Sequence, residues 1–204
     1  MDSKYRPIDV DAAFSLLSGL ENGVIVKPSV LSVGGHGIKV LKKGTSKEEL
    51  VAALAKQPNC VIQELISQHE KMSSLHKESV NTIRIVTWVR ANGKVEVLNS
   101  IVRMGVGGSF VDNASSGGIF CGIKEDGWLS DVAYNTSGKR FERHPQGAEF
   151  GIVQVPNYDQ CIDLVLELAP RMLSTSRLVS WDIAINDAGK PLLIEANLGT
   201  VGKC

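Results

Sequence analysis

The stretch SWDIAINDAGKPLLIEANLG, residues 180–199, decides the fold, because it holds two strands of alternating character and the most informative polar side chains of the chain. We expect strands over 179–185 and 192–197, joined by a four-residue loop at 187–190. The loop sets the pairing register of this hairpin, and the register decides which side chains share a face of the sheet.

In this register, Asp182 lies directly opposite Glu195, and the period of two along a strand places Asn197 on the same face. The other face is apolar and takes Trp181, Ile183, Ile185, Leu192 and Ile194. Two carboxylates and an amide oxygen therefore converge on one face.

Facing carboxylates destabilise a strand pair by roughly 0.2 to 1 kcal/mol, and a cation between them would reverse the sign. Oxygen ligands without His or Cys suit Mg²⁺, which takes one or two carboxylates and completes its shell with water and phosphate oxygens. The alternative is a solvated polar face. Relief of repulsion predicts that Asp182→Asn leaves the fold intact or slightly more stable.

A second hairpin lies at residues 81–104, where strands over 82–90 and 95–104 flank the turn Asn92-Gly93. A two-residue turn places Arg84 opposite Ile101 and diagonal to Arg103. Two guanidiniums on one face can hold a phosphate or carboxylate. The commoner alternative is that they pair with nearby Glu or Asp side chains.

The N-terminal part predicts a small α/β lobe. Strands at 24–27 and 38–41 form a hairpin around the glycine-rich tip VGGHG, and a strand at 60–66 follows. Helices are expected over 9–17 and 47–57, the second one starting with a capping box. Lys27 and the tip glycines suit a bound phosphate, whereas a solvent-facing lysine and a plain turn are the alternatives.

The second lobe begins near residue 80, so the expected domains are 1–80 and 81–204. The glycine-rich stretch 105–118 is either a linker or a loop whose backbone approaches a ligand, and the flanking strands favour the loop. A helix is expected from the cap Asn157 to about residue 173.

Composition excludes several classes of protein. The 22 Lys and Arg residues balance the 22 Asp and Glu residues, so the positive excess of a nucleic-acid-binding protein is absent. The apolar runs are too short for a membrane span, and the first residues are too polar for a secretory signal. Four widely spaced cysteines fit neither a metal motif nor a disulfide scaffold, and we expect a reducing cytoplasm.

Taken in order, these segments resemble the ATP-grasp superfamily. They are VKPSVLSVGGHG with its Lys strand and glycine flap, the strand VIQELI, the arginine strand, and E-A-N with its upstream Asp. NTIRIVT, DNASSGG, WDIAI and LIEAN are most similar to the sugar-transfer-associated ATP-grasp branch, which is placed with cell-surface polysaccharide genes. The resemblance implies an α+β, ATP-grasp fold with two lobes, mainly antiparallel sheets and ATP held between them.

The same resemblance implies roles for individual residues. The nucleotide would be bound by Lys27, Gly34, Gly35, Gly37, Gln63, Glu64, Leu65, Ile66 and Glu70. The metal, Mg²⁺ or Mn²⁺, would be bound by Asp182, Glu195 and Asn197. Arg84 and Arg103, with Lys27, would be catalytic, and Asn113, Gly117 and Gly118 would line the acceptor side.

The implied activity is phosphorylation of a carboxylate by ATP, followed by attack of an amine or thiol on the acyl-phosphate and release of ADP. A kinase acting on a hydroxyl and a non-catalytic nucleotide-binding module are the alternatives. The family normally has a domain before the Lys strand, where this chain has about 20 residues. A second copy or a partner chain could therefore complete the acceptor site.

Overall fold

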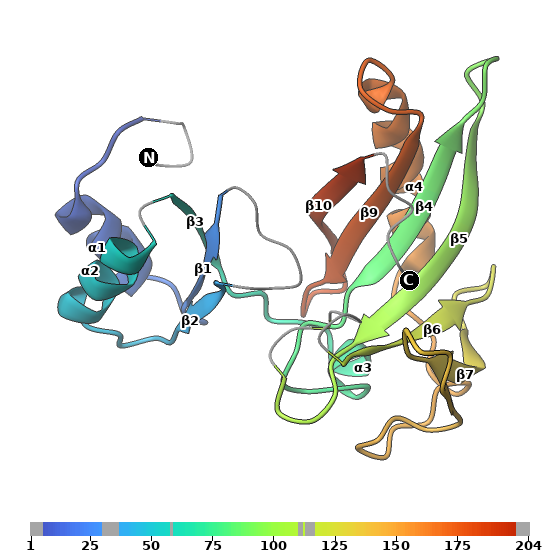
Figure 1. Cartoon of the computed structure of the whole chain (residues 1–204), viewed down its shortest axis with the longest axis horizontal. Coiled ribbons are helices and arrows are strands. Elements are labelled where there is room, and N and C mark those ends of the chain that lie inside the picture. Colours follow the sequence, from blue (N-terminus) through green and yellow to red (C-terminus); the bar gives the residue numbers. More distant parts are fainter. Residues whose placement is uncertain (1–5, 30–36, 58, 110–111, 113–116, 199–204) are drawn as a thin grey trace. The chain divides into compact units, whose positions relative to one another are not determined.

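The computed structural model describes residues 6–29, 37–57, 59–109, 112 and 117–198. The chain forms two compact units, Met1–Ser67 and Gln68–Cys204 (Figure 1). This division falls earlier than residue 80, where the sequence analysis placed it. Met72 and Leu75 are buried in the core of the larger unit, so the segment after Ser67 packs with that unit.

The smaller unit is a three-stranded antiparallel sheet in the order β2-β1-β3, covered by two helices. Its elements are α1 (Val10–Ser18), β1 (Val24–Pro28), β2 (Lys39–Leu41), α2 (Lys47–Lys56) and β3 (Cys60–Glu64). Val24 and Val26 alternate into a core shared with Leu50 and Ala53 of α2. The expected capping box is present, since Ser46 accepts from Glu49 N and Glu49 accepts from Ser46 N.

The larger unit is a seven-stranded antiparallel sheet in the order β10-β9-β4-β5-β6-β7-β8. Its strands are β4 (Ile83–Val89), β5 (Val95–Met104), β6 (Ile119–Ile123), β7 (Leu129–Tyr134), β8 (Arg140–Phe141), β9 (Leu178–Ile185) and β10 (Pro191–Leu198). Its helices are α3 (Glu70–Ser73), α4 (Tyr158–Leu168) and the 3₁₀ helix η2 (Ala169–Met172). Helix α4 lies behind the sheet, against β4 and β5 (Figure 1).

Strand β9 separates the core from the polar face of the larger unit. Val179, Trp181 and Ile183 belong to the hydrophobic core. The alternate residues, among them Ser180 and Asp182, point to the other face of the sheet and are nevertheless buried. Asp182 is only 1% exposed, so this carboxylate needs partners that compensate its charge.

The β9–β10 hairpin differs from expectation at its turn and agrees with it further along. The turn has three residues, because Asn186 N donates to the Lys190 carbonyl at 3.0 Å, and Gly189 adopts the left-handed region with φ +78°. This shifts the register by one, but an irregularity between Leu193 and Glu195 shifts it back. Asp182 therefore faces Glu195, as expected.

The placement of Leu192 on the apolar face was wrong. The register near the turn pairs Leu192 with Ala184 and Leu193 with Ile183. Leu192 therefore lies on the face of Asp182, and Leu193 takes the side of the core. Ile194 is the additional residue of the bulge.

The β4–β5 hairpin repeats the same pattern. Arg90 N donates to the Lys94 carbonyl at 2.8 Å, which gives a three-residue turn instead of the expected two-residue one. A shift of register between Val86 and Thr87 compensates for it, so that Arg84 faces Ile101 as expected.

The helix expected from Asn157 is α4, continued by η2, and Asn157 stands at its N-cap position as expected, but the expected side-chain cap is not formed. Asn157 has φ +48° and makes no side-chain cap. Its side-chain amide instead donates to the Gly189 carbonyl at 2.8 Å.

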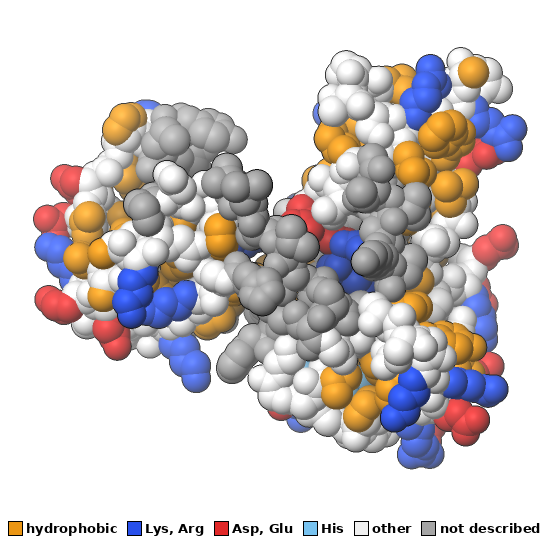
Figure 2. Space-filling model, viewed as in Figure 1, with side chains coloured by type: hydrophobic (Ala, Val, Ile, Leu, Met, Phe, Trp, Pro, Cys, Tyr) orange, Lys and Arg blue, Asp and Glu red, His pale blue; other side chains and the backbone are white. Residues whose placement is uncertain are grey.

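In the described part of the chain, no helix combines the length and the apolar character needed to cross a membrane. On the visible face of each unit, acidic and basic side chains lie interspersed (Figure 2).

Candidate functional site

The polar face of the larger sheet gathers two arginines on one carboxylate. Arg84 on β4 faces Asp182 on β9, and its Nε and Nη2 donate to the two carboxylate oxygens at 2.8 and 2.7 Å. Arg103 on β5 adds a third bond from Nη2 to Oδ2 at 3.1 Å. Of the two alternatives for this arginine pair, the structure shows pairing with an acidic side chain.

Burial strengthens these interactions. The side chains of Arg84 and Arg103 are 11% and 9% exposed, and that of Asp182 is 1% exposed. Burial alone lowers the pKa of Arg84, but the hydrogen bonds and charge of Asp182 outweigh it, so that this pKa lies above its ordinary value. Attraction to two guanidiniums thus outweighs the repulsion between Asp182 and Glu195 that the sequence analysis considered. We therefore expect Asp182→Asn to lower the stability of the fold instead of raising it.

A second carboxylate, Asp112, joins the cluster from the glycine-rich segment. Its Oδ2 accepts the backbone N–H of Thr82 at 3.1 Å and the hydroxyl of Thr82, and it lies 3.5 Å from Arg103 Nη2. Thr82 Oγ1 in turn accepts from Arg103 Nη2 at 2.7 Å. Burial raises the pKa of Asp112, although Arg103 and Thr82 act against this.

Sequence reasoning missed Asp112 and Thr82. One signal was available, because Asp112 is an acidic residue within the DNASSGG motif, and two arginines on one face require more than one anionic partner. Its contact with Thr82 spans 30 residues and could not be located from the sequence.

Glu195 and Asn197 on β10 lie beside Asp182. The Asn197 amide nitrogen is 3.2 Å from Glu195 Oε1 and 3.5 Å from Asp182 Oδ2. The sequence placed the amide oxygen there, whereas the structure presents the amide N–H groups to both carboxylates. A donor group thus stands at the position between the carboxylates where the sequence analysis expected a cation.

This donor set fits a divalent cation in composition and proximity. Asp182 and Glu195 each place a carboxylate oxygen within 3.5 Å of the Asn197 amide nitrogen, and carboxylate and amide oxygens are ligands that Mg²⁺ takes. Among the described residues, no three His, Cys, Asp or Glu side chains are grouped to hold a metal, so a cation here would use two carboxylates and one amide. Asn197 would have to turn its amide so that the oxygen faces the cation.

Residues expected to bind the nucleotide lie on the smaller unit. Lys27 and Gln63 are on the sheet face that points away from the core, since the alternate residues Val24 and Val26 are buried. In the described sheet, β3 is an edge strand, so backbone groups of Gln63 and Glu64 are not all used by a neighbouring strand. Leu65 N donates to the Gly23 carbonyl at 3.0 Å.

The remaining expected residues divide between the described and the undescribed parts of the chain. Gly34, Gly35 and Asn113 lie outside the described residues. Gly37 is exposed just before β2, Ile66 follows β3, and Glu70 begins α3 in the larger unit. Gly117 is exposed and Gly118 is buried immediately before β6.

Two buried histidines hold the backbone where the glycine-rich segment begins. His76 Nε2 donates to the Gly107 carbonyl at 2.9 Å, and His144 Nε2 donates to the Gly105 carbonyl at 2.8 Å. The rings lie 5.4 Å apart. Burial lowers the pKa of His144, and the charge of His76 adds to this, while the Gly105 carbonyl and Glu78 oppose it.

His76 also approaches Ser79 and Glu78, in an arrangement that resembles a hydrolase triad. Ser79 Oγ is 2.8 Å from His76 Nδ1, and Glu78 Oε2 is 3.2 Å from Nε2. Ser79 is 2% exposed, and its hydroxyl accepts from Gly105 N. The serine is therefore closed to substrate, and the group is structural.

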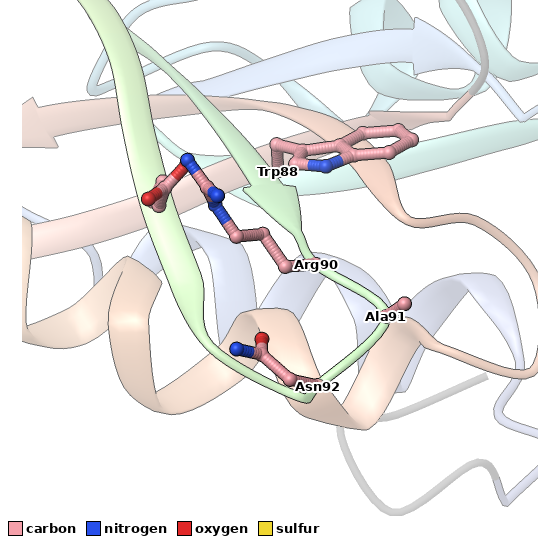
Figure 3. A pocket seen from close by; sticks show the side chains of 5 residues that line it. Trp88, Arg90, Ala91 and Asn92 are labelled. Atoms are coloured by element: carbon pink, nitrogen blue, oxygen red, sulfur yellow. The ribbon is translucent and has the colours of Figure 1, made fainter.

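A separate cavity of about 460 Å³ lies at the opposite end of β4. It is lined by Trp88, Arg90, Ala91, Asn92 and Glu96. Figure 3 shows the Arg90 side chain reaching across the hairpin from the labelled turn residues, and its Nε lies 2.6 Å from Glu96 Oε2. Trp88 lies four residues, or about 13 Å, along the strand from Arg84, so this cavity is distinct from the arginine cluster.

Comparison with solved structures identifies the fold as ATP-grasp. The biotin carboxylase domain of 2-oxoglutarate carboxylase from Hydrogenobacter thermophilus, in complex with MgADP, ADP and bicarbonate, has a TM-score of 0.56 at 15% identity, with 95% of this chain and 35% of that chain covered. N5-carboxyaminoimidazole synthetase from Staphylococcus aureus, in complex with ADP, has a TM-score of 0.56 at 8% identity, with 96% and 39% covered. D-alanyl-alanine synthetase A from Vibrio cholerae has 0.51 at 10% identity, with 95% and 46% covered.

The sequence specifies the branch. Residues 4–202 match the family described as sugar-transfer associated ATP-grasp, and the chain belongs to this family. The chain spans less than half the length of the solved proteins named above. Comparison with curated proteins gives no match.

Proposed function

We propose that this chain is the ATP-binding, Mg²⁺-dependent core of a ligase that activates a carboxylate as an acyl-phosphate for attack by an amine or thiol, releasing ADP. We place this activity in the cytoplasm and in the synthesis of cell-surface polysaccharide. The carboxylate and the amine are small molecules in this proposal, and a second copy or a partner chain completes the acceptor site. Membership of the sugar-transfer associated family supports the biological setting.

The observation that carries the proposal is the convergence of Arg84 and Arg103 on Asp182, with Glu195 and Asn197 alongside. Phosphoryl transfer needs alignment and charge neutralisation more than a side-chain nucleophile. Guanidiniums supply the donors for phosphate oxygens, and the carboxylates supply ligands for a cation. The cluster contains both kinds of group within hydrogen-bond distance of each other.

In the structure the two kinds of group neutralise each other. Each guanidinium donates to Asp182, so binding a phosphate requires Arg84 or Arg103 to exchange at least part of that contact for phosphate oxygens. Asp182 and Glu195, with the amide oxygen of Asn197, would hold Mg²⁺. The cation, when bound, would neutralise and orient the phosphate oxygens. We expect Lys27 to donate to the phosphates, as the resemblance to the family implies.

The solved neighbours support ligase chemistry by their names. They include the synthetases given above and an L-amino acid ligase from Bacillus licheniformis, which has a TM-score of 0.51 at 13% identity. One neighbour contains MgADP and another ADP, which supports ATP and Mg²⁺ as the cofactors.

Calorimetric titration with MgATP, followed by hydroxylamine trapping with a panel of carboxylates, tests the proposal. We expect binding that requires Mg²⁺, ADP as the product, and a hydroxamate from the acyl-phosphate. Arg103→Met should weaken binding by about tenfold or more, whereas the control Arg171→Met removes an exposed arginine paired with Glu167 and should have no effect.

The remaining outcomes of these experiments either contradict the proposal or indicate one of the alternative functions. No MgATP binding by the wild type would contradict the proposal at its first step. ADP release with a phosphate ester and no hydroxamate would indicate the kinase. Binding without turnover of any acceptor would indicate the nucleotide-binding module.

A further inference from the structure

Asp112 makes fewer and longer contacts with the arginine pair than Asp182 does. Asp182 is part of β9 and takes two bonds from Arg84 and one from Arg103. Asp112 lies outside any strand, and its only described guanidinium contact is at 3.5 Å to Arg103. Asp112 also accepts the N–H and the hydroxyl of Thr82, so its displacement breaks these two bonds as well. On Arg103 itself, its 3.5 Å contact is longer than the 3.1 Å bond to Asp182, so an anion that competes for Arg103 displaces Asp112 first.

We propose that Asp112 is a positioning residue that occupies the place of a phosphate on Arg103 while no nucleotide is bound, and that the phosphate of the incoming nucleotide displaces it. This inference rests on the proposed function. It adds to that function a competitor inside the site, the Asp112 carboxylate, which lowers the affinity for nucleotide.

Charge explains why both anions do not remain. Arg84 and Arg103 balance Asp182 and Asp112, so the buried cluster is neutral as it stands. A phosphate added on Arg103 beside an ionised Asp112 would place like charges within hydrogen-bond distance in a poorly solvated site. Departure of Asp112 removes this repulsion and frees donors of Thr82 and Arg103 for the phosphate.

The surrounding contacts keep the displacement local. The Gly105 and Gly107 carbonyls are fixed by His144 and His76, and Gly105 N donates to Ser79 Oγ at 3.2 Å. Strand β5 and the start of the glycine-rich segment therefore stay in place when the Asp112 carboxylate leaves.

The variant Asp112→Asn tests the competition. Asparagine retains an oxygen that accepts from Thr82 N but loses the negative charge. We expect the affinity for the magnesium complex of the non-hydrolysable analogue adenosine 5′-(β,γ-imido)triphosphate to rise by about three- to tenfold. A purely structural role predicts unchanged or weaker binding. The control Glu125→Gln removes one negative charge from an exposed turn of the same unit and should leave the affinity unchanged.

The wild-type protein gives a second readout that needs no variant. Thr82 N donates to Asp112 Oδ2, so the backbone amide resonance of Thr82 in ¹H–¹⁵N spectra reports on this contact. Titration with the same analogue should shift the Thr82 amide together with the Arg103 Nε–H signal. Movement of the Arg103 signal alone would show that the phosphate binds with Asp112 in place and would overturn the inference.

The outcomes separate the two proposals. Binding by the wild type with no gain in Asp112→Asn overturns the role of Asp112 and leaves the proposed function standing. No binding by either protein overturns both. Binding by both proteins that is tighter in Asp112→Asn supports both proposals.

Discussion

Replacement of Asp182 by asparagine should strongly destabilise the larger unit, although it removes one of two facing carboxylates. Asp182 is 1% exposed and accepts from Arg84 Nε at 2.8 Å, from Arg84 Nη2 at 2.7 Å and from Arg103 Nη2 at 3.1 Å. The Asp182→Asn side chain would keep one acceptor oxygen and would turn an N–H donor toward a guanidinium donor. Two buried cations would then share a single buried counter-charge, that of Asp112.

Breaking a buried ion pair by removing one partner costs about 3 to 5 kcal/mol, and the retained oxygen places Asp182→Asn near the lower end. For a domain on the order of 150 residues, about 3 kcal/mol lowers Tm by roughly 10 °C. The repulsion between facing carboxylates, at roughly 0.2 to 1 kcal/mol, is smaller and acts in the opposite direction. The net effect is therefore destabilising.

Urea unfolding followed by tryptophan fluorescence measures this effect in the full chain. All three tryptophans, at positions 88, 128 and 181, lie in the larger unit, so the signal reports on that unit. Asp187→Asn is the matched control, because Asp187 is exposed in the turn of the same hairpin. Combining Asp182→Asn with Arg84→Gln in a double-mutant cycle should recover part of the loss. A stability of Asp182→Asn equal to or above that of the wild type would refute the reasoning and restore the repulsion argument.

Three further changes have defined outcomes. Glu195→Gln removes an exposed carboxylate, so we expect the free energy of unfolding to stay within about 0.5 kcal/mol of the wild type. Calorimetry should show Mg²⁺-dependent nucleotide binding weakened by about tenfold, and unchanged binding would remove Glu195 from the metal site. Thr87→Val deletes the hydroxyl that accepts the Trp181 indole N–H at 2.8 Å in the core. Urea unfolding should show that the free energy of unfolding falls by about 1 to 3 kcal/mol in Thr87→Val and is retained in Thr87→Ser. An equal fall in both variants would assign the effect to packing. Burial lowers the pKa of His144 below its ordinary 6.5, so the unfolded chain takes up a proton at this residue before the folded chain does. The free energy of unfolding should therefore be at its full value above pH 6.5 and should fall as the pH decreases below it, with a smaller fall in His144→Gln. Identical pH profiles of the two proteins would assign the effect to another group.

The sequence predicts the strands of the central hairpins well because their alternation is long. Strand β5 has the expected bounds, β9 differs by one residue at one end, and β4 and β10 differ by one residue at each end. Strands β7 and β8 were not predicted, and β6 was expected only as a strand flanking the glycine-rich stretch, without bounds. They are short, and Gly122 within β6 and the polar residues of β8 weaken the strand signal, so pairing with neighbouring strands defines them more than local preference does.

The polar partners of the site could not be predicted from spacing alone. Arg84 and Asp182 are 98 residues apart, and the choice of Asp182 over another acidic residue follows from the pairing of β4 with β9. The contact between Asp112 and Thr82 depends on the path of a glycine-rich segment, which has no periodicity to read. The sequence analysis predicted arginines and carboxylates on shared sheet faces, but it could not predict which arginine pairs with which carboxylate.

The two bulges explain why Asp182 faces Glu195 and Arg84 faces Ile101 as expected, although both turns differ from expectation. Without the bulge in β10, the register set by the turn would place Glu195 opposite Trp181, and its carboxylate would point into the hydrophobic core. Without the bulge in β5, Arg103 would likewise move to the core face of the sheet. Burying an unpaired charge costs far more than the one or two ladder hydrogen bonds that a bulge disrupts. The charged residues therefore fix the register at their own end of each hairpin, the glycine turns fix it at the other end, and the bulge accommodates the difference of one residue. The polar side chains thus determine the strand pairing that brings them together.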